Sequence, residues 1–307
     1  MKYLFNISFL FIFLNPLLAQ LPGASGGSQS DVLDGVYTQE HIPKKRLVPY
    51  AHLREADVMW SKRIWRVLDL KEKMNHKLLY PLEPQNDVRS LFDVIKFAAY
   101  SGTDGAITLY EEGLEGDDKF RNPILESDFS SPKEFKTKLD EMFGRKGTRD
   151  SLDADDNPVL KLDGTTEQVV YIDPYQTFDI KRYILKEDWF FDKQRSMLDV
   201  RIIGIAPEVI NYNPQGDIVG FKKTFWLYFP KCRETFNNSF VYNNSNDAQK
   251  MSFDDLFRKR EFSSFVEKES NVFDRKIGPT WTGIDALLES ERIRNEIFTF
   301  EHDLWHF

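Results

Sequence analysis

The stretch that decides the fold runs from residue 180 to residue 206 and reads IKRYILKEDWFFDKQRSMLDVRIIGIA. Two runs rich in β-branched and aromatic residues flank the turn residues Asp192-Lys193-Gln194, which predicts two strands joined by a short turn. Strands joined in this way lie antiparallel. The strands expected in the C-terminal half are residues 169–172, 180–191, 197–206 and 218–229. The sequence therefore predicts an antiparallel β-meander.

Several amphipathic helices are expected to pack with this meander. Ser90 with Asp93, and Ser131 with Pro132 and Glu134, are patterns typical of helix starts. Ser252 with Asp255 and Thr282 with Asp285 indicate two further starts. The last helix would place one apolar face toward the core, made of Ile293, Ile297, Phe300 and Leu304.

The beginning of the folded body has two interpretations. Apolar residues recur at helical spacing from Leu53 to Leu68 and predict an amphipathic helix over residues 53–62. The continuation, residues 64–70, also alternates as a strand does, and periodicity leaves both readings open. The segment partly matches residues 185–200, so an internal duplication also stays open.

The fold class expected is α+β, with an antiparallel β-meander in the C-terminal half, several amphipathic helices and an extended N-terminal arm. A short strand is expected over residues 106–110, and a polar interval follows the helix that begins after Ser131. The expected organisation is a signal peptide (1–19), a flexible linker and extended arm (20–52), a helix-rich half of the core (53–144), a polar loop (145–163), a β-rich half (164–282) and a C-terminal helix (283–307).

The amino terminus predicts export. Lys2 precedes a mostly apolar run, and Ala19 provides the small residue at which a secretory signal peptide would be cut. The run is too short and too interrupted to span a membrane. The Gly/Ser-rich stretch after it contains a G-x-S-x-G match at residues 23–27, but no strand or helix is expected beside it, so the match predicts no nucleophile.

The arm is the candidate partner-binding segment. Pro43 and Pro49 favour an extended backbone in the arm. Its apolar residues must pack against its own domain or against a neighbouring subunit, and the sequence leaves both open. The residues predicted to bind a partner are Tyr37, Ile42, Pro43, Val48 and Tyr50.

Composition limits the function classes. The 307 residues include 49 acidic and 41 basic side chains, a net charge of −8, which argues against a nucleic-acid binder. The single cysteine excludes an intrachain disulfide. Because no later segment is long and apolar enough to cross a bilayer, membrane contact is expected only through partners.

Motifs that carry chemistry are weak throughout. His302 and His306 have the spacing of a helical zinc pair, but they lie at the end of the chain. Residues 153–157 resemble the start of a calcium loop, but Pro158 replaces the required glycine. Cys232 could be an activated thiol, although a packed small residue at the end of a strand is the commoner role. We predict no catalytic, cofactor-binding or metal-binding residues and no cofactor.

Five stretches resemble the gliding motility protein GldN family, called PorN in non-gliding relatives. They are YTQEHIP (37–43), LREADVMWSKRIWR (53–66), KEDWFFD (186–192), VRIIGIAP (200–207) and SFDDLF (252–257). The resemblance covers most of the chain beyond the linker and weakens over residues 145–163 and at the C-terminal tail.

The resemblance implies a structural subunit of the type IX secretion and gliding machinery of Bacteroidetes, without enzymatic activity. Members are expected in the periplasm at the inner face of the outer membrane. They form a ring with the lipoprotein GldK/PorK and contact the periplasmic domain of the motor component GldM/PorM. The alternatives are an exported metal-dependent hydrolase and a cell-wall-binding module. The module would need exposed aromatics, whereas Trp60, Trp65, Trp189 and Trp226 are expected in the core.

Overall fold

The computed structural model describes residues 46–85, 88–101, 107–113, 116–150, 166, 168–213, 215–243, 250–273 and 275–304. The expected signal peptide, the linker and most of the arm, including Tyr37, Ile42 and Pro43, lie outside the described residues. The remainder belongs to one compact unit that begins at Lys45.

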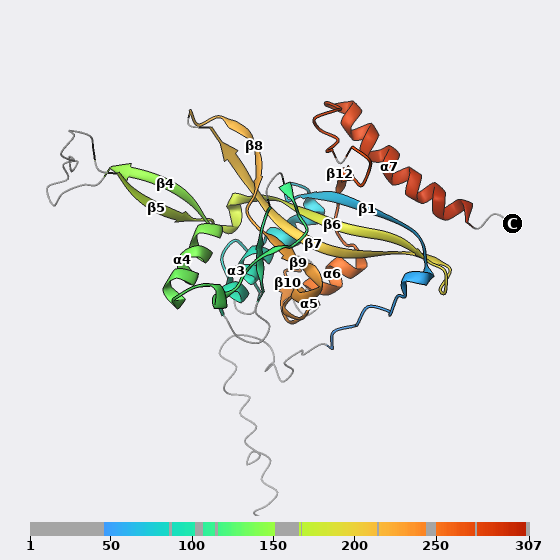
Figure 1. The fold of residues 1–307 in the computed structure, drawn as a ribbon, viewed down its shortest axis with the longest axis horizontal. Coiled ribbons are helices and arrows are strands. Elements are labelled where there is room, and N and C mark those ends of the chain that lie inside the picture. Colours follow the sequence, from blue (N-terminus) through green and yellow to red (C-terminus); the bar gives the residue numbers. More distant parts are fainter. Residues whose placement is uncertain are drawn as a thin grey trace, which may run out of the picture. The chain divides into compact units, whose positions relative to one another are not determined.

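An eight-stranded antiparallel sheet organises this unit (Figure 1). Its path is β12-β1-β6-β7-β9-β2-β3, and β8 pairs with β7 beside it. The strands are β1 (Val58–Asp69), β2 (Leu109–Glu111), β3 (Asn122–Ile124), β6 (Ile180–Asp192), β7 (Met197–Tyr212), β8 (Ile218–Lys223), β9 (Trp226–Tyr228) and β12 (Phe265–Glu269). The predicted α+β class with an antiparallel sheet is therefore confirmed.

The hairpin predicted from residues 180–206 is the longest pairing of the sheet. β6 and β7 run antiparallel from Asp192 opposite Met197 to Ile180 opposite Val209. β7 extends beyond the predicted end to Tyr212. The single strand expected over residues 218–229 is instead divided into β8 and β9, with Phe225 buried between them.

The helix predicted over residues 53–62 is wrong. Only Glu55–Asp57 form a 3-10 turn, and β1 begins at Val58. β1 lies between β12 and β6, and residues 64–68 are all buried. Residues 58–62 of β1 alternate between half-buried and exposed positions. Val58, Met59 and Trp60 are all apolar whichever face they occupy, so the sequence does not show the alternation that marks a strand. The matching residues 185–200 form the end of β6, a turn and the start of β7, so the two segments are not structurally equivalent.

Three of the four helix starts predicted from capping residues are confirmed, at Ser90, Ser131 and Ser252. Ser131 and Ser252 accept hydrogen bonds from the backbone N–H groups of Glu134 and Asp255. Thr282 does not cap the last helix, because Gly283, with φ of 59°, occupies the position before it. The helices are α2 (His76–Leu79), α3 (Leu91–Ser101), α4 (Pro132–Met142), α5 (Phe229–Asn238), α6 (Phe253–Lys259) and α7 (Ile284–Asp303), with 3-10 turns at Glu55–Asp57, Lys73–Asn75, Glu126–Asp128 and Thr177–Asp179.

Two small sheets complete the described elements. β10 (Phe240–Val241) pairs with β11 (Met251–Ser252), and β4 (Gly144–Asp150) pairs with β5 (Gln168–Pro174). The prediction of a polar loop is therefore wrong for residues 145–150, while residues 151–163 lie outside the described part. A two-stranded ribbon covers no core along its length, so both of its faces can carry polar side chains. The sequence of β4 therefore lacks the apolar alternation by which a strand is recognised. β5 pairs with β4 and not with the meander.

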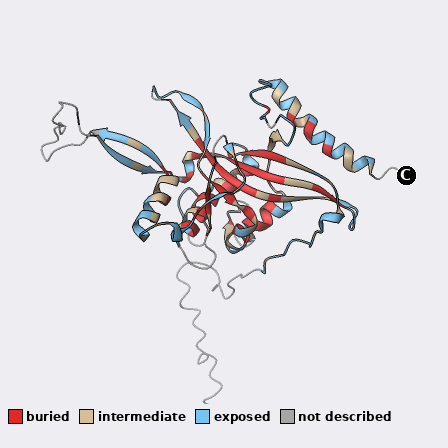
Figure 2. Ribbon diagram, viewed as in Figure 1, coloured by how far each residue is buried: buried red, intermediate tan, exposed pale blue. Residues whose placement is uncertain are grey.

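The core lies on both faces of the sheet. Figure 2 shows that the long strands of the sheet contain many of the buried residues. On one face Leu185 and Ile205 pack against apolar residues of α3, α5 and α6. On the opposite face Trp65, Ile184 and Trp226 form a smaller cluster. Trp65 and Trp226 are thus core residues as expected, whereas Trp60 and Trp189 are half-buried at the α7 end.

Candidate partner-binding site

The described part of the arm lies against its own domain. The guanidinium of Arg233 lies over the Tyr50 ring, with 4.1 Å between the guanidinium carbon and the ring centroid. The guanidinium carbon of Arg201 is 5.2 Å from the same centroid. Arg233 donates to the carbonyl of Val48 at 2.8 Å, and Arg201 donates to the carbonyl of Ala51. Backbone and ring contacts therefore fix the point at which the arm enters the body, and we call these residues the arm anchor.

A buried ion pair supports the arm anchor from below. Arg233 on α5 donates two hydrogen bonds to Asp254 on α6, at 2.8 and 2.9 Å. Both side chains are almost fully buried. Burial raises the pKa of Tyr50, an effect that the two arginines partly oppose. Removing either partner of this pair would leave an uncompensated buried charge. The pair and its hydrogen bonds therefore hold α5 and α6 in a defined geometry beside the arm.

Of the five predicted partner-binding residues, the structure describes only Val48 and Tyr50. Both remain partly exposed while they contact the domain. Sequence reasoning missed Arg201, Arg233 and Asp254, which lie about 150 to 200 residues further along the chain. No local signal marks such distant partners, apart from the occurrence of charged residues within otherwise apolar runs.

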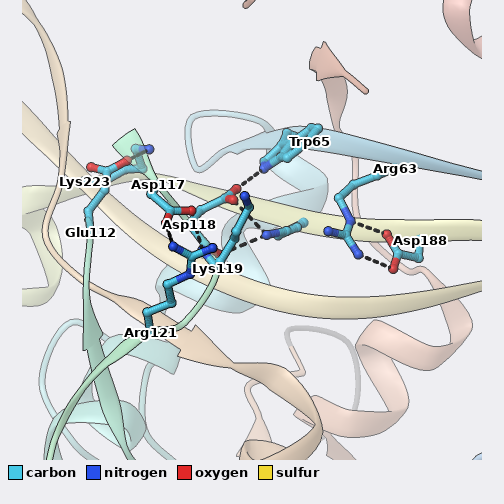
Figure 3. Close-up of polar contacts among 10 residues, drawn as sticks. Arg63, Trp65, Glu112, Asp117, Asp118, Lys119, Arg121, Asp188 and Lys223 are labelled. Carbon is cyan, nitrogen blue, oxygen red and sulfur yellow. Dashed lines mark hydrogen bonds and ion pairs between the residues drawn. The ribbon is translucent and has the colours of Figure 1, made fainter. Parts of the chain in front are cut away.

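A second polar cluster holds a connection across the other face of the sheet (Figure 3). We call residues 112–121 the strap; its residues 114–115 lie outside the described part. Lys186, only 2% exposed, donates to the Asp118 carboxylate at 2.8 Å and to its carbonyl at 2.9 Å. Trp65 donates its indole N–H to the same carboxylate. Burial alone would raise the pKa of Asp118, but the hydrogen bonds from Lys186 and Trp65 hold it below its usual value.

Aromatic packing locks the strap beside this ion pair. Phe120, with a positive φ of 54°, packs its ring onto the bare backbone of Gly204. A Cβ at residue 204 would lie 2.5 Å from the Phe120 ring, so only glycine permits this approach. Phe120 also makes edge-on contacts with Tyr110, Trp226 and Tyr228.

The surrounding charges are paired in the same manner. Arg63 and Asp188 form a two-hydrogen-bond pair at 2.6 and 2.7 Å, and Lys223 pairs with Glu112 at the base of the strap (Figure 3). Among the described residues no group of three or more His, Cys, Asp or Glu side chains could hold a metal ion. This arrangement can hold elements together, but it offers no catalytic constellation.

The motifs singled out in the sequence do not form a site within the described residues. Cys232 lies in α5, not at the end of a strand, and burial raises its pKa to about 12, so it is a packed, unreactive thiol. His302 is exposed near the end of α7, while His306 and residues 153–157 lie outside the described part. No helix in the described part is long and apolar enough to cross a membrane.

The fold and its sites define an α+β protein whose buried charges anchor an arm and a strap to a large antiparallel sheet. The family model described as gliding motility associated protein GldN matches residues 53–306. Since this match covers most of the chain, the protein belongs to the GldN family, and the resemblance seen in the sequence is confirmed. A comparison with curated proteins finds no match.

Proposed function

We propose that the chain is a structural subunit of the type IX secretion and gliding motility machinery. The observation that carries this proposal is the GldN family match over residues 53–306. In the proposed arrangement the protein acts in the periplasm at the inner face of the outer membrane, forms a ring with the lipoprotein GldK/PorK and contacts the periplasmic domain of GldM/PorM. It has no enzymatic activity, and membrane contact occurs only through partners.

The arm is the proposed docking element. Val48 and Tyr50 belong to the arm anchor and contact Arg233 of the domain. Residues 31–45 therefore precede a fixed attachment point. Tyr37, Ile42 and Pro43 in that segment are the residues proposed to contact a partner. A segment that carries apolar side chains and is attached to a folded body can bind a neighbour through a small, specific surface.

Deletion of residues 31–45 tests this role. The deletion stops before Arg46 because residues 48 and 51 contribute carbonyls to the arm anchor. We expect the shortened chain to fold with unchanged thermal stability but to be lost from complexes isolated with the outer-membrane lipoprotein. The measurement is the ratio of the two proteins in material purified from native envelopes through a tag on the lipoprotein.

A matched control deletes residues 21–30, which shortens the same terminus but keeps the arm. This control should co-purify normally. Normal co-purification of the chain that lacks residues 31–45 would show that the arm is not the docking element. The hydrolase and cell-wall-binding alternatives gain no specific observation from the described residues.

A further inference from the structure

The ribbon formed by β4 and β5 has an unpaired edge. β4 pairs with β5 from Gly144 to Asp150, and in the described part of the chain it pairs with no other strand. Figure 2 shows that most of the ribbon is exposed. The free N–H and C=O groups of such an edge can pair with a further extended segment.

A groove follows this edge. Its volume is about 620 Å³, within the range of clefts that bind ligands. The residues that line it are Lys146, Gly147 and Thr148 of β4, Val170 of β5, and Tyr212 and Asn213 at the end of β7. Successive side chains of a strand point to opposite faces, so a groove lined by three consecutive residues runs along the edge of the strand.

Two arginines of β4 form no ion pair with any residue of the described part. The guanidinium carbon of Arg145 lies 5.2 Å from the ring centroid of Tyr212, and that of Arg149 lies 5.7 Å from the ring centroid of Tyr171. Arg145 also donates a hydrogen bond to the Tyr175 side chain. Both arginines are exposed. Each guanidinium has five N–H donors, so donors remain for a carboxylate.

The charge of β4 contrasts with that of the chain. Residues 144–149 carry three basic side chains and no acidic one, whereas the whole chain has a net charge of −8. Lys146 pairs with Glu141 at 3.0 Å, but Arg145 forms no ion pair with Asp173, its partner across the ladder. Opposite charges on neighbouring strands stabilise strand pairing. A strand added at this edge is therefore favoured when it carries carboxylates.

The spacing of the arginines defines the pattern that such a strand would carry. Arg145, Gly147 and Arg149 share one face of the ribbon, because side chains alternate along a strand. The Tyr171 ring covers Gly147, where a Cβ would lie 2.6 Å from a ring atom. This ring is 42% exposed, so an apolar side chain beside Gly147 can pack against it. The matching strand has an acidic, an apolar and an acidic residue at alternate positions.

We propose that the edge of β4 binds an acidic extended segment of a partner protein as an added strand. Two carboxylates of that segment, four residues apart, pair with Arg145 and Arg149, and the apolar side chain between them packs on Tyr171. Main-chain hydrogen bonds supply affinity, and the side chains supply specificity. The inference does not depend on the proposed function, because it rests on the ribbon and not on the arm.

Two labelled peptides of identical composition test this pattern. The matching peptide, with blocked ends, is Thr-Thr-Asp-Thr-Val-Thr-Asp-Thr-Thr, which reads the same in both directions. The control, Thr-Thr-Asp-Val-Thr-Asp-Thr-Thr-Thr, places its two acids on opposite faces of a strand. Fluorescence anisotropy measures their binding to the exported form of the chain. The control should bind at least about tenfold more weakly, because only one of its carboxylates can meet an arginine.

Substitutions locate the binding on the ribbon. Arg149→Gln should weaken the matching peptide at least about tenfold, and it leaves the hydrogen bond between Arg145 and Tyr175 in place. The matched control is Lys193→Gln, which removes an exposed charge at the turn between β6 and β7. This control should bind the matching peptide as the natural chain does.

The remaining outcomes would overturn the proposal. Equal binding of the two peptides would mean that charge alone attracts them. Failure of the matching peptide to bind, or unchanged binding by Arg149→Gln, would exclude the edge of β4 as its site. Sedimentation of the chain alone tests another occupant, because self-association that Arg149→Gln abolishes would place a second copy on this edge.

Discussion

Glu208 is a buried acid on β7 whose neighbours across the sheet are Arg182 on β6 and Lys223 on β8. It is only 4% exposed. Burial raises the pKa of Glu208 to about 7, and the charge of Glu267 adds to this effect. The folded chain therefore prefers the neutral carboxyl group, although cationic residues lie nearby.

This preference predicts a pH-dependent stability. The pKa of Glu208 is higher in the folded chain than its ordinary value of 4.5. Its contribution to stability is fully present below pH 4.5 and is lost as the pH rises through about 7. Since each pKa unit corresponds to about 1.4 kcal/mol, the loss is at most about 3 kcal/mol. In Glu208→Gln, urea unfolding measured from pH 4.5 to pH 8 should show a smaller decline than in the natural chain.

The exposed Glu55 provides the control for this measurement. Glu55→Gln should retain the decline of the natural chain. If the stability of Glu208→Gln declines with pH as steeply as that of the natural chain, then protonation of Glu208 does not cause the decline.

At the scale of elements, the strap predicts an energetic coupling between Lys186 and Asp118. Lys186 is buried and Asp118 is half-buried, and each loses its charge partner if the other is removed, so Lys186→Met and Asp118→Asn should each destabilise by about 3 kcal/mol. The double variant should be more stable than the sum of the two losses predicts, by at least about 1 kcal/mol. Chemical denaturation of the four chains measures this coupling.

The pair Arg63 and Asp188 is the matched control, because it joins neighbouring strands on the same face but is more exposed. Its coupling should be smaller, below about 1 kcal/mol. Additive losses at Lys186 and Asp118 would mean that their ion pair does not hold the strap to the sheet.

The sequence could predict those parts of the fold that depend on residues close together in the chain. Ser90, Ser131 and Ser252 lie within three residues of their hydrogen-bonding partners, so the helix starts were readable. The β6–β7 hairpin was readable for the same reason. Strand β1 was not readable, because Val58, Met59 and Trp60 are apolar on both faces and residues 64–68 are all buried. The strap contact was not, since Lys186 and Asp118 are 68 residues apart.

At the scale of the whole molecule, the arm anchor, the strap and the two-faced core hold the described elements together in one compact unit. The arm residues Tyr37, Ile42 and Pro43 stay predictions, since they lie outside the described residues. The same holds for the partners and the cellular location. The anchoring of Val48 and Tyr50 on the domain could not be predicted, because it depends on Arg201 and Arg233 far along the chain.

The most direct test of a structural role is the dependence of secretion on copy number. A scaffold is needed in fixed proportion to its partners, whereas an enzyme acts repeatedly and suffices in few copies. Cells that lack the natural gene would express this chain at graded levels while secretion of a cargo protein and the copy number of the chain are measured. The account predicts that secretion falls in proportion as copies fall below the normal number. Full secretion at a few per cent of that number would contradict it.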